Sequence, residues 1–461
     1  MSLKAAFIVP HPPIILPEIG HGEEKKIRKT TDAYLEIAER ISKIRPETII
    51  VTTPHSILYA DYFHISPDLK AKGDMRRFGV RNLTIEVEYD NDFVRVLSDE
   101  AQKDNIPAGT LGERDPGLDH GTFIPLYFIN KFYKDYKLVR IGLSGLSHLE
   151  HYRFGKTIER TVEKLGRNTV FIASGDLSHK LLHDGPYGFT EEGPEFDKQV
   201  TEAMKKGDFL SFINFDPAFC EAAAECGLRS FLIMAGALDG KAVNSELLSY
   251  EGSFGVGYAV AAFEVIGKNE SRHFDIVYEK EQHEKLEEIK SAEDAYVKLA
   301  RLSLETYVRT GKYAKLPNDL PDEMLTRKAG VFVSLKKHGQ LRGCIGTISA
   351  VTGSIADEIL RNAVSAGTDD PRFSPVTEKE LDELVYSVDV LAEPEPISSI
   401  DELDVKKYGV IVSSGYRRGL LLPNLEGVDT PEQQVAIALQ KAGISKKEPY
   451  SMQRFEVVRH N

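Results

Sequence analysis

The sequence predicts an α/β domain with a central sheet and flanking helices, followed by an α+β domain. From residue 1 to about 267, short β-branched runs alternate with amphipathic stretches, a pattern typical of strands joined by crossover helices. A charged segment with few large apolar side chains follows. The length of 461 residues corresponds to about two or three domains. We therefore expect domains at residues 1–267 and 291–461, joined by a linker at residues 268–290.

In the first domain, apolar side chains recur at helical spacing over residues 23–44 and predict a helix there. Apolar, β-branched runs predict strands elsewhere in this domain. These expected strands lie at residues 5–9, 47–53, 137–143, 169–173 and 258–266.

In the second domain, Ser291 and Asp294 form a capping-box pair that predicts the start of a helix. Three strands are expected, at residues 331–335, 341–345 and 385–391. The first two flank a short loop that contains His338, which is a hairpin-like arrangement.

Composition limits the partners. The 71 acidic residues exceed the 58 basic ones, and the formal net charge of −13 repels a phosphate backbone, so we expect no nucleic-acid partner. No uninterrupted apolar stretch reaches the roughly 18 residues that span a bilayer, so we expect no membrane segment. Three cysteines, an odd number in a long chain, favour a reducing compartment, and we expect a cytoplasmic protein.

Two histidines occupy matching positions after predicted strands. His11 follows the strand at 5–9 and a proline, and His55 follows the strand at 47–53 and a proline. Ligands of parallel sheets bind at the carboxyl ends of the strands, so both imidazoles are expected at one rim. Paired imidazoles suit Fe, Zn or Cu. The alternative is that each histidine caps a strand end with a hydrogen bond.

Two more histidines are candidates for the same rim. His179 follows the fourth predicted strand and is suited to move protons for a metal-bound substrate. Its alternative is a helix entry capped by Asp176 or Ser178. His120 begins an apolar stretch, where a helix amino end and an imidazole donor can hold an oxyanion. Its alternative is a turn capped by Asp119.

A metal site of the two-histidine, one-carboxylate type also needs an acidic ligand. Glu225, just before the apolar segment at 230–238, is the first candidate. Its neighbour Cys226 is an alternative ligand, because a thiolate binds Fe, Zn and Cu well. Glu221 and Asp176 are weaker candidates. The sequence leaves the choice between Glu225 and Cys226 open.

These motifs give the first domain a specific resemblance. In chain order they are HPP with His11, TPH with His55, LDHGTFIPL with His120, SGDLSH with His179 and ECGLRSFLIMAGAL with Glu225. Residues 5–266 thereby resemble class III extradiol ring-cleavage dioxygenases, the LigB-like family. Cys226 departs from the pattern of this family, and the related Memo proteins place a cysteine near this position.

The resemblance implies a small aromatic, catechol-like substrate and non-haem Fe(II), with Zn or Cu as alternatives. It implies His11, His55 and Glu225 as metal ligands. It also implies His179 as the catalytic acid or base, and His120 as a catalytic contact of substrate or oxygen.

In the second domain, the string LRGCIG places Cys344 between two glycines. A nearby cation, Arg342, predicts a reactive thiol, and the alternative is a buried structural cysteine. LRGCIG, the DPRF segment and RRGLLLP together resemble the AMMECR domain over about residues 291–457. Arginines of these motifs can bind an anion if they converge, and ordinary pairing with acidic side chains is the alternative.

A LigB-like domain followed by an AMMECR domain resembles the arrangement of AmmeMemoRadiSam systems, which implies a Memo-like protein and a radical-SAM protein as partners. The leading functional expectation is an iron-dependent oxygenase of catechol-like aromatic compounds. The alternative is a metal-binding accessory protein of such a radical-SAM-linked modification system, without dioxygenase turnover. A zinc hydrolase is a weaker third hypothesis.

Overall fold

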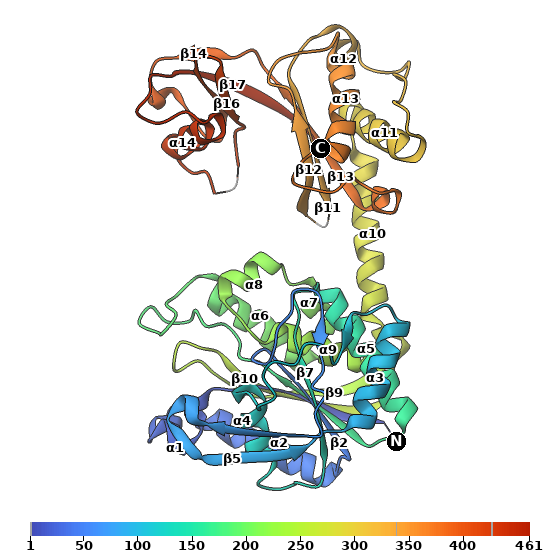
Figure 1. The fold of residues 1–461 in the computed structure, drawn as a ribbon, viewed down its shortest axis with the longest axis vertical. Coiled ribbons are helices and arrows are strands. Elements are labelled where there is room, and N and C mark those ends of the chain that lie inside the picture. The colour runs from blue at the N-terminus through green and yellow to red at the C-terminus, as the bar shows by residue number, and fades with distance from the viewer. Residues whose placement is uncertain (1, 338, 426) are drawn as a thin grey trace. The chain divides into compact units, whose positions relative to one another are not determined.

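The computed structural model describes residues 2–337, 339–425 and 427–461, so His338 of the expected hairpin lies outside it. The chain divides into two compact units, Met1–Glu281 and Gln282–Asn461. The division falls within helix α10 (Phe274–Ala292), so the segment expected as a linker is largely helical (Figure 1). Within the described residues, no helix combines the length and the apolar character needed to cross a bilayer.

The N-terminal unit is built on a six-stranded mixed sheet with the strand order β7-β2-β8-β1-β10-β9. The first four strands of this order are parallel to one another. Strand β10 pairs antiparallel with β1, and β9 pairs antiparallel with β10. Two small sheets pair β3 with β6 and β4 with β5. The strands are β1 (Leu3–Val9), β2 (Thr48–Thr53), β3 (Phe63–His64), β4 (Lys70–Met75), β5 (Val80–Glu88), β6 (Ala108–Gly109), β7 (Lys137–Gly142), β8 (Thr169–Ser174), β9 (Lys241–Glu251) and β10 (Tyr258–Lys268).

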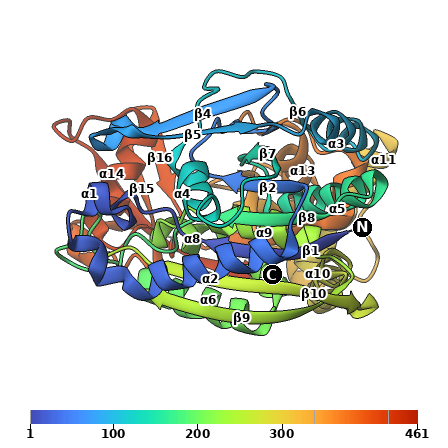
Figure 2. The same cartoon turned by 90° about the horizontal axis from the view of Figure 1, so that it is seen from below.

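Helices cover both faces of this sheet. Ala5 and Phe7 of β1 belong to the core shared with α2 and α4, whereas Ala6 and Ile8 belong to the core shared with α5 and α9. Because β1 is buried on both faces, its sequence is a continuous apolar run. Figure 2 shows α2 lying along β10 and β9. The helices are α1 (Pro17–Gly20), α2 (Arg28–Ile44), α3 (Asn91–Lys103), α4 (His120–Ile129), α5 (His148–Leu165), α6 (Glu192–Lys206), α7 (Phe209–Asn214), α8 (Pro217–Ala223) and α9 (Leu228–Ala237).

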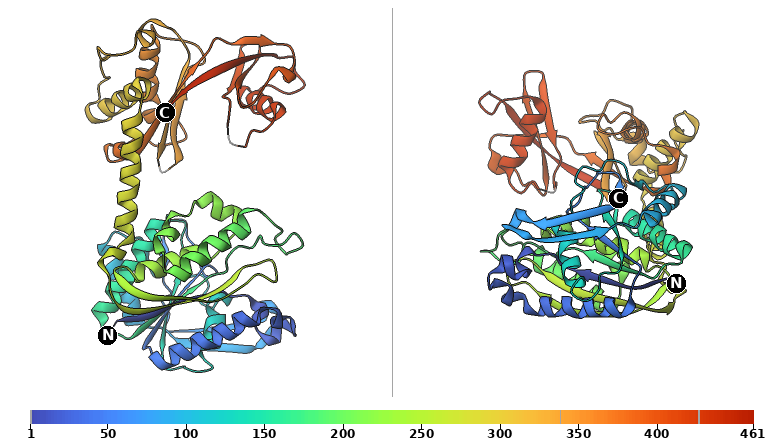
Figure 3. Two further views of the ribbon diagram at one scale, coloured as in Figure 1. Left: turned by 180° about the vertical axis from the view of Figure 1, so that it is seen from behind. Right: turned by 60° about the horizontal axis from the view of Figure 1, so that its bottom comes forward.

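The C-terminal unit contains a seven-stranded antiparallel sheet with the order β12-β11-β13-β17-β15-β16, in which β14 also pairs with β17. The long strand β17 joins two halves of this sheet, one covered by α11 and α13 and the other by α14 (Figure 3). Its elements are α11 (Ala295–Thr310), α12 (Asp322–Thr326), β11 (Val331–Lys337), β12 (Gln340–Gly346), α13 (Ile355–Thr368), β13 (Leu384–Leu391), β14 (Glu395–Ile397), β15 (Tyr408–Ser414), β16 (Arg417–Leu421), α14 (Pro431–Ala442) and β17 (Ser451–His460).

Two expectations about helix starts are wrong. Ser291 is not part of a capping box, because α10 continues through Ala292 and the Ser291 hydroxyl donates to the carbonyl of Glu288 within that helix. Asp294 alone caps α11, accepting from the backbone amides of the next turn. No helix starts beside Asp176 either, because the segment after β8 stays irregular until α6.

Candidate functional site

The carboxyl ends of β1, β2 and β8 form one rim, since all three strands are parallel and β8 lies between the other two. His11 and His55 follow the ends of β1 and β2, and their Nε2 atoms lie 2.9 Å apart. The Sγ atom of Cys226 lies 3.7 Å from the Nε2 atom of His11. Among the described residues, one group of three metal-binding side chains comes together in this way: His11, His55 and Cys226, with ligand atoms within 4.8 Å of one another.

The hydrogen bonds around His11 assign its tautomer. The Ser174 hydroxyl gives its only proton to the carbonyl of Gly121, so at 2.9 Å it must accept from Nδ1 of His11. Nε2 of His11 therefore presents a lone pair towards Nε2 of His55. Two facing nitrogens need a cation or a proton between them. The donor set, two imidazoles and a thiol, fits Fe, Zn or Cu.

Cys226, rather than Glu225, brings its ligand atom to this group. The backbone amide of Asp176 donates to Sγ of Cys226 at 3.3 Å. Burial raises the pKa of the Cys226 thiol well above its ordinary value. Glu225 instead uses Oε2 to accept from the amide of Leu228 at 2.6 Å, in the first turn of α9. Of the two candidates that the sequence left open, Cys226 is thus the one that lies with His11 and His55 in a His/His/Cys group.

Burial lowers the pKa values of His11 and His55, and the nearby His179 contributes a smaller lowering of both. Its Nδ1 atom lies 2.6 Å from the carbonyl of Ala224 and must donate to it, so Nε2 is the free acceptor. Burial lowers the pKa of His179 below its ordinary value, which keeps the ring neutral near pH 7. A neutral imidazole with one free nitrogen is suited to accept a proton.

His120 stacks on His55, with ring centroids 4.1 Å apart. Burial and the neighbouring His55 lower its pKa to about 4. Asp119 caps α4 by accepting from the amide of Thr122, so the capped-turn alternative describes the backbone correctly. The same cap places the His120 ring at the rim, where it stacks on His55.

A cavity of about 410 Å³ opens beside these rings and includes His55 and His120 in its lining. Phe78 and Leu118 supply apolar walls, and Arg77 is a charged lining residue. The size suits a small molecule.

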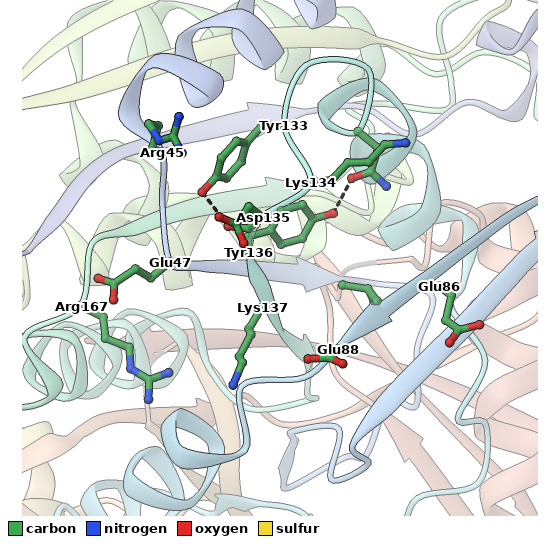
Figure 4. Close-up of a pocket in the computed structure, with 12 residues that line it drawn as sticks. Arg45, Glu47, Glu86, Glu88, Tyr133, Lys134, Asp135, Tyr136, Lys137 and Arg167 are labelled. Atoms are coloured by element: carbon green, nitrogen blue, oxygen red, sulfur yellow. Dashed lines mark hydrogen bonds between the residues drawn. The ribbon is translucent and has the colours of Figure 1, made fainter.

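A larger cavity of about 760 Å³ lies at the opposite, amino ends of β2 and β7 (Figure 4). Tyr136 donates there to the side chain of Asn130 at 2.9 Å, and Tyr133 donates to the carbonyl of Asp135 at 2.6 Å. None of its lining residues is a histidine or a cysteine. The candidate site histidines that line a cavity, His55 and His120, therefore line the smaller one.

Sequence reasoning missed several residues that support the site. Ser174 orients His11, and its position as the last residue of β8 was the available signal. Gly121 leaves room for the cluster, because a Cβ atom there would lie 2.5 Å from Oγ1 of Thr53. Asp176, expected as a weaker ligand candidate or a helix cap, accepts from the backbone amide of His11 at 2.7 Å, and burial raises its pKa to about 7.

In the C-terminal unit, half-buried Cys344 accepts a hydrogen bond from the Ser334 hydroxyl at 3.2 Å. Its backbone amide donates to Asp370, and Arg372 binds that same carboxylate. Arg342, the cation expected beside the thiol, pairs with Glu380 at 2.9 Å. The other motif arginines also have local partners, Glu448 for Arg417 and Gln453 for Arg418. These contacts agree with ordinary pairing rather than with an anion site.

Comparison with known proteins identifies both domains. The family "Catalytic LigB subunit of aromatic ring-opening dioxygenase" matches residues 5–261, and AMMECR1 matches residues 297–460. A protein of Clostridium acetobutylicum is 45% identical over 469 residues, covering 100% of this chain and 99% of the relative. A Thermotoga maritima protein is 51% identical over 170 residues, covering 36% of this chain and 98% of the relative.

Among solved structures, an uncharacterized protein of Pyrococcus horikoshii is similar with 34% identity and a TM-score of 0.34, over 36% of this chain and 88% of that chain. The fold around the histidine rim, the match to the LigB family model and the relative that covers the whole chain all indicate the same family. The chain belongs to the LigB family of aromatic ring-opening dioxygenase subunits and carries a second domain of the AMMECR1 family.

Proposed function

We propose that the N-terminal unit is a non-haem, iron-dependent oxygenase that opens catechol-like aromatic rings. His11, His55 and Cys226 would hold Fe(II), and iron when bound supplies the electron transfer to oxygen that organic side chains lack. The observation that carries the proposal is the meeting of two imidazole Nε2 atoms and one thiol beside a cavity of small-molecule size.

The chain's own residues have distinct roles in this proposal. His179 accepts a proton from a catechol hydroxyl at Nε2, since its Nδ1 atom is committed to the Ala224 carbonyl. His120, neutral at physiological pH, contacts substrate or oxygen as a hydrogen-bonding group. Phe78, whose ring centroid lies 5.3 Å from that of His120, supplies an apolar wall of the cavity beside this ring.

A second candidate follows from the thiol. Ring-opening sites of the two-histidine, one-carboxylate type leave open positions at iron for oxygen and substrate, and here Cys226 stands where that carboxylate is expected. A metal-binding accessory protein of an AmmeMemoRadiSam system, with a Memo-like protein and a radical-SAM protein as partners, accounts for the same centre without turnover.

Anaerobic loading with Fe(II) tests the two candidates. The oxygenase predicts about one iron per chain and oxygen uptake with a yellow ring-opened product when catechols are added. The variant His179→Gln should retain the iron and lose oxygen uptake. Tight iron binding without oxygen uptake for any catechol would reject the oxygenase and favour the accessory protein. Failure to bind Fe(II), Zn or Cu would reject both.

A further inference from the structure

Arg140 is a buried cation behind the histidine rim that the proposed function does not use. It lies in the middle of β7, and only 1% of its surface is exposed. Removing a guanidinium from water costs several kcal/mol unless its donors and its charge are matched. The structure therefore has to supply partners for this side chain, and those partners are specific.

Two of its three hydrogen bonds hold one loop. Nη2 of Arg140 donates to the backbone carbonyl of Asp115 at 3.1 Å, and Nη1 donates to the backbone carbonyl of Gly117. Nε donates to the hydroxyl of Ser66 at 2.7 Å. The loop residues 110–119 have no helix or strand of their own, so these bonds fix the segment that leads into α4.

The charge of Arg140 faces two acidic residues of the same loop. Oε2 of Glu113 lies 3.7 Å from Nη2, and this buried oxygen has no hydrogen-bond partner among the described residues. Oδ2 of Asp119 lies 3.8 Å from Nη1. The guanidinium thus compensates the carboxylate of Glu113, whose Oε2 also lies 3.8 Å from Nε2 of His64, and the carboxylate of Asp119, which caps α4.

A chain of contacts connects Asp119 to the metal-binding side chains. Oδ1 of Asp119 accepts from the hydroxyl of Thr53 at 2.6 Å, and Oγ1 of Thr53 accepts from the backbone amide of His55 at 3.2 Å. Asp119 also directly precedes His120, whose ring stacks on His55. The loop residues that Arg140 holds line the cavity beside these two rings.

We propose that Arg140 is a positioning residue that sets the placement of His55 and His120 around the metal and fixes the adjoining cavity wall. The inference rests on the proposed metal centre. A planar guanidinium offers five donors in a fixed fork, whereas a lysine ammonium is a point charge on a flexible stem. The variant Arg140→Lys keeps the charge facing Glu113 and Asp119 and loses the fork.

Co(II) binding to the full-length protein tests the inference, because Co(II) reports both affinity and ligand geometry through its visible bands. We expect Arg140→Lys to raise the Kd for Co(II) by about 10-fold, the lower end of the effect of losing a direct partner of a ligand, because Arg140 acts on His55 through Asp119 and Thr53, and to shift the bands. Arg167→Lys is the matched control, since Arg167 pairs with buried Asp90 away from the rim. It should keep the Kd and the bands of the parent protein even if its Tm falls.

Ser66→Ala is a milder second variant, because it removes the partner of Nε and keeps both bonds of Arg140 to the loop. We expect a smaller rise in Kd, of about several-fold, in the same direction. If both variants keep the parent Kd and bands, the inference is wrong while the metal centre stands. If the parent protein itself binds no Co(II), the metal centre fails, and the inference fails with it.

Discussion

Metal binding should release about one proton per site, and that proton should come from Cys226. The perturbation is a titration of metal into the parent protein and into Cys226→Ala, near pH 7.5. Burial lowers the pKa of His11 well below its ordinary 6.5, and burial also lowers that of His55. Both imidazoles are therefore neutral at this pH and bind without losing a proton.

The thiol behaves in the opposite way. Burial and the nearby carboxylates of Asp176 and Glu225 raise the pKa of Cys226 well above 9.0, so the sulfur is protonated before the metal arrives. A thiolate is the binding form, so the proton must leave on binding. The apparent affinity should then rise about tenfold for each pH unit, or about 1.4 kcal/mol, between about pH 7 and pH 9.

Isothermal titration calorimetry in two buffers of different ionisation enthalpy counts the protons released. Cys226→Ala is the control for any proton lost by metal-bound water, because that loss is common to both proteins. The difference between the two proteins should be about one proton. A difference near zero would mean that the thiol does not bind. Proton release that Cys226→Ala retains would come from groups other than the thiol, such as metal-bound water or an imidazole that starts out protonated.

Three further outcomes are expected. Gly175→Ala should raise the Kd for metal and destabilise the fold by about 1–3 kcal/mol, because a Cβ there would overlap the Cα of Gly227 beside the cysteine ligand. Gly267→Ala, where no atom lies within 4 Å of the added Cβ, should change unfolding by less than about 0.5 kcal/mol, and an equal effect of both in denaturant melts would refute the contact. His179→Gln should bind metal normally while single-turnover rates with catechols fall by about 10²- to 10⁴-fold, and metal loss would contradict its role as a base. In metal-loaded protein a thiol reagent should label half-buried Cys344 first, and a fast phase that persists in Cys344→Ser would show that another thiol reacts.

The fold could be predicted because its signals are local. Each expected strand is present, and the prolines before His11 and His55 mark where β1 and β2 end. Parallel pairing of both strands with β8 then brings the two imidazoles to one rim, as the general rule for α/β sheets predicts. The start of α11 was less predictable, because a serine three residues before an acid has the same local pattern inside a helix as at its cap.

The sequence by itself determined the two-domain organisation, eight of the strands and the two histidines at strand ends, since these depend on periodicity and on neighbours in the chain. Only the tertiary structure decided between Glu225 and Cys226, which are adjacent in sequence but turn to different partners, one to an α9 amide and the other to the imidazoles. The contacts of Ser174 and Arg140 were also decided there. Their partners lie tens of residues away in the chain, and burial in a low-dielectric interior strengthens those hydrogen bonds.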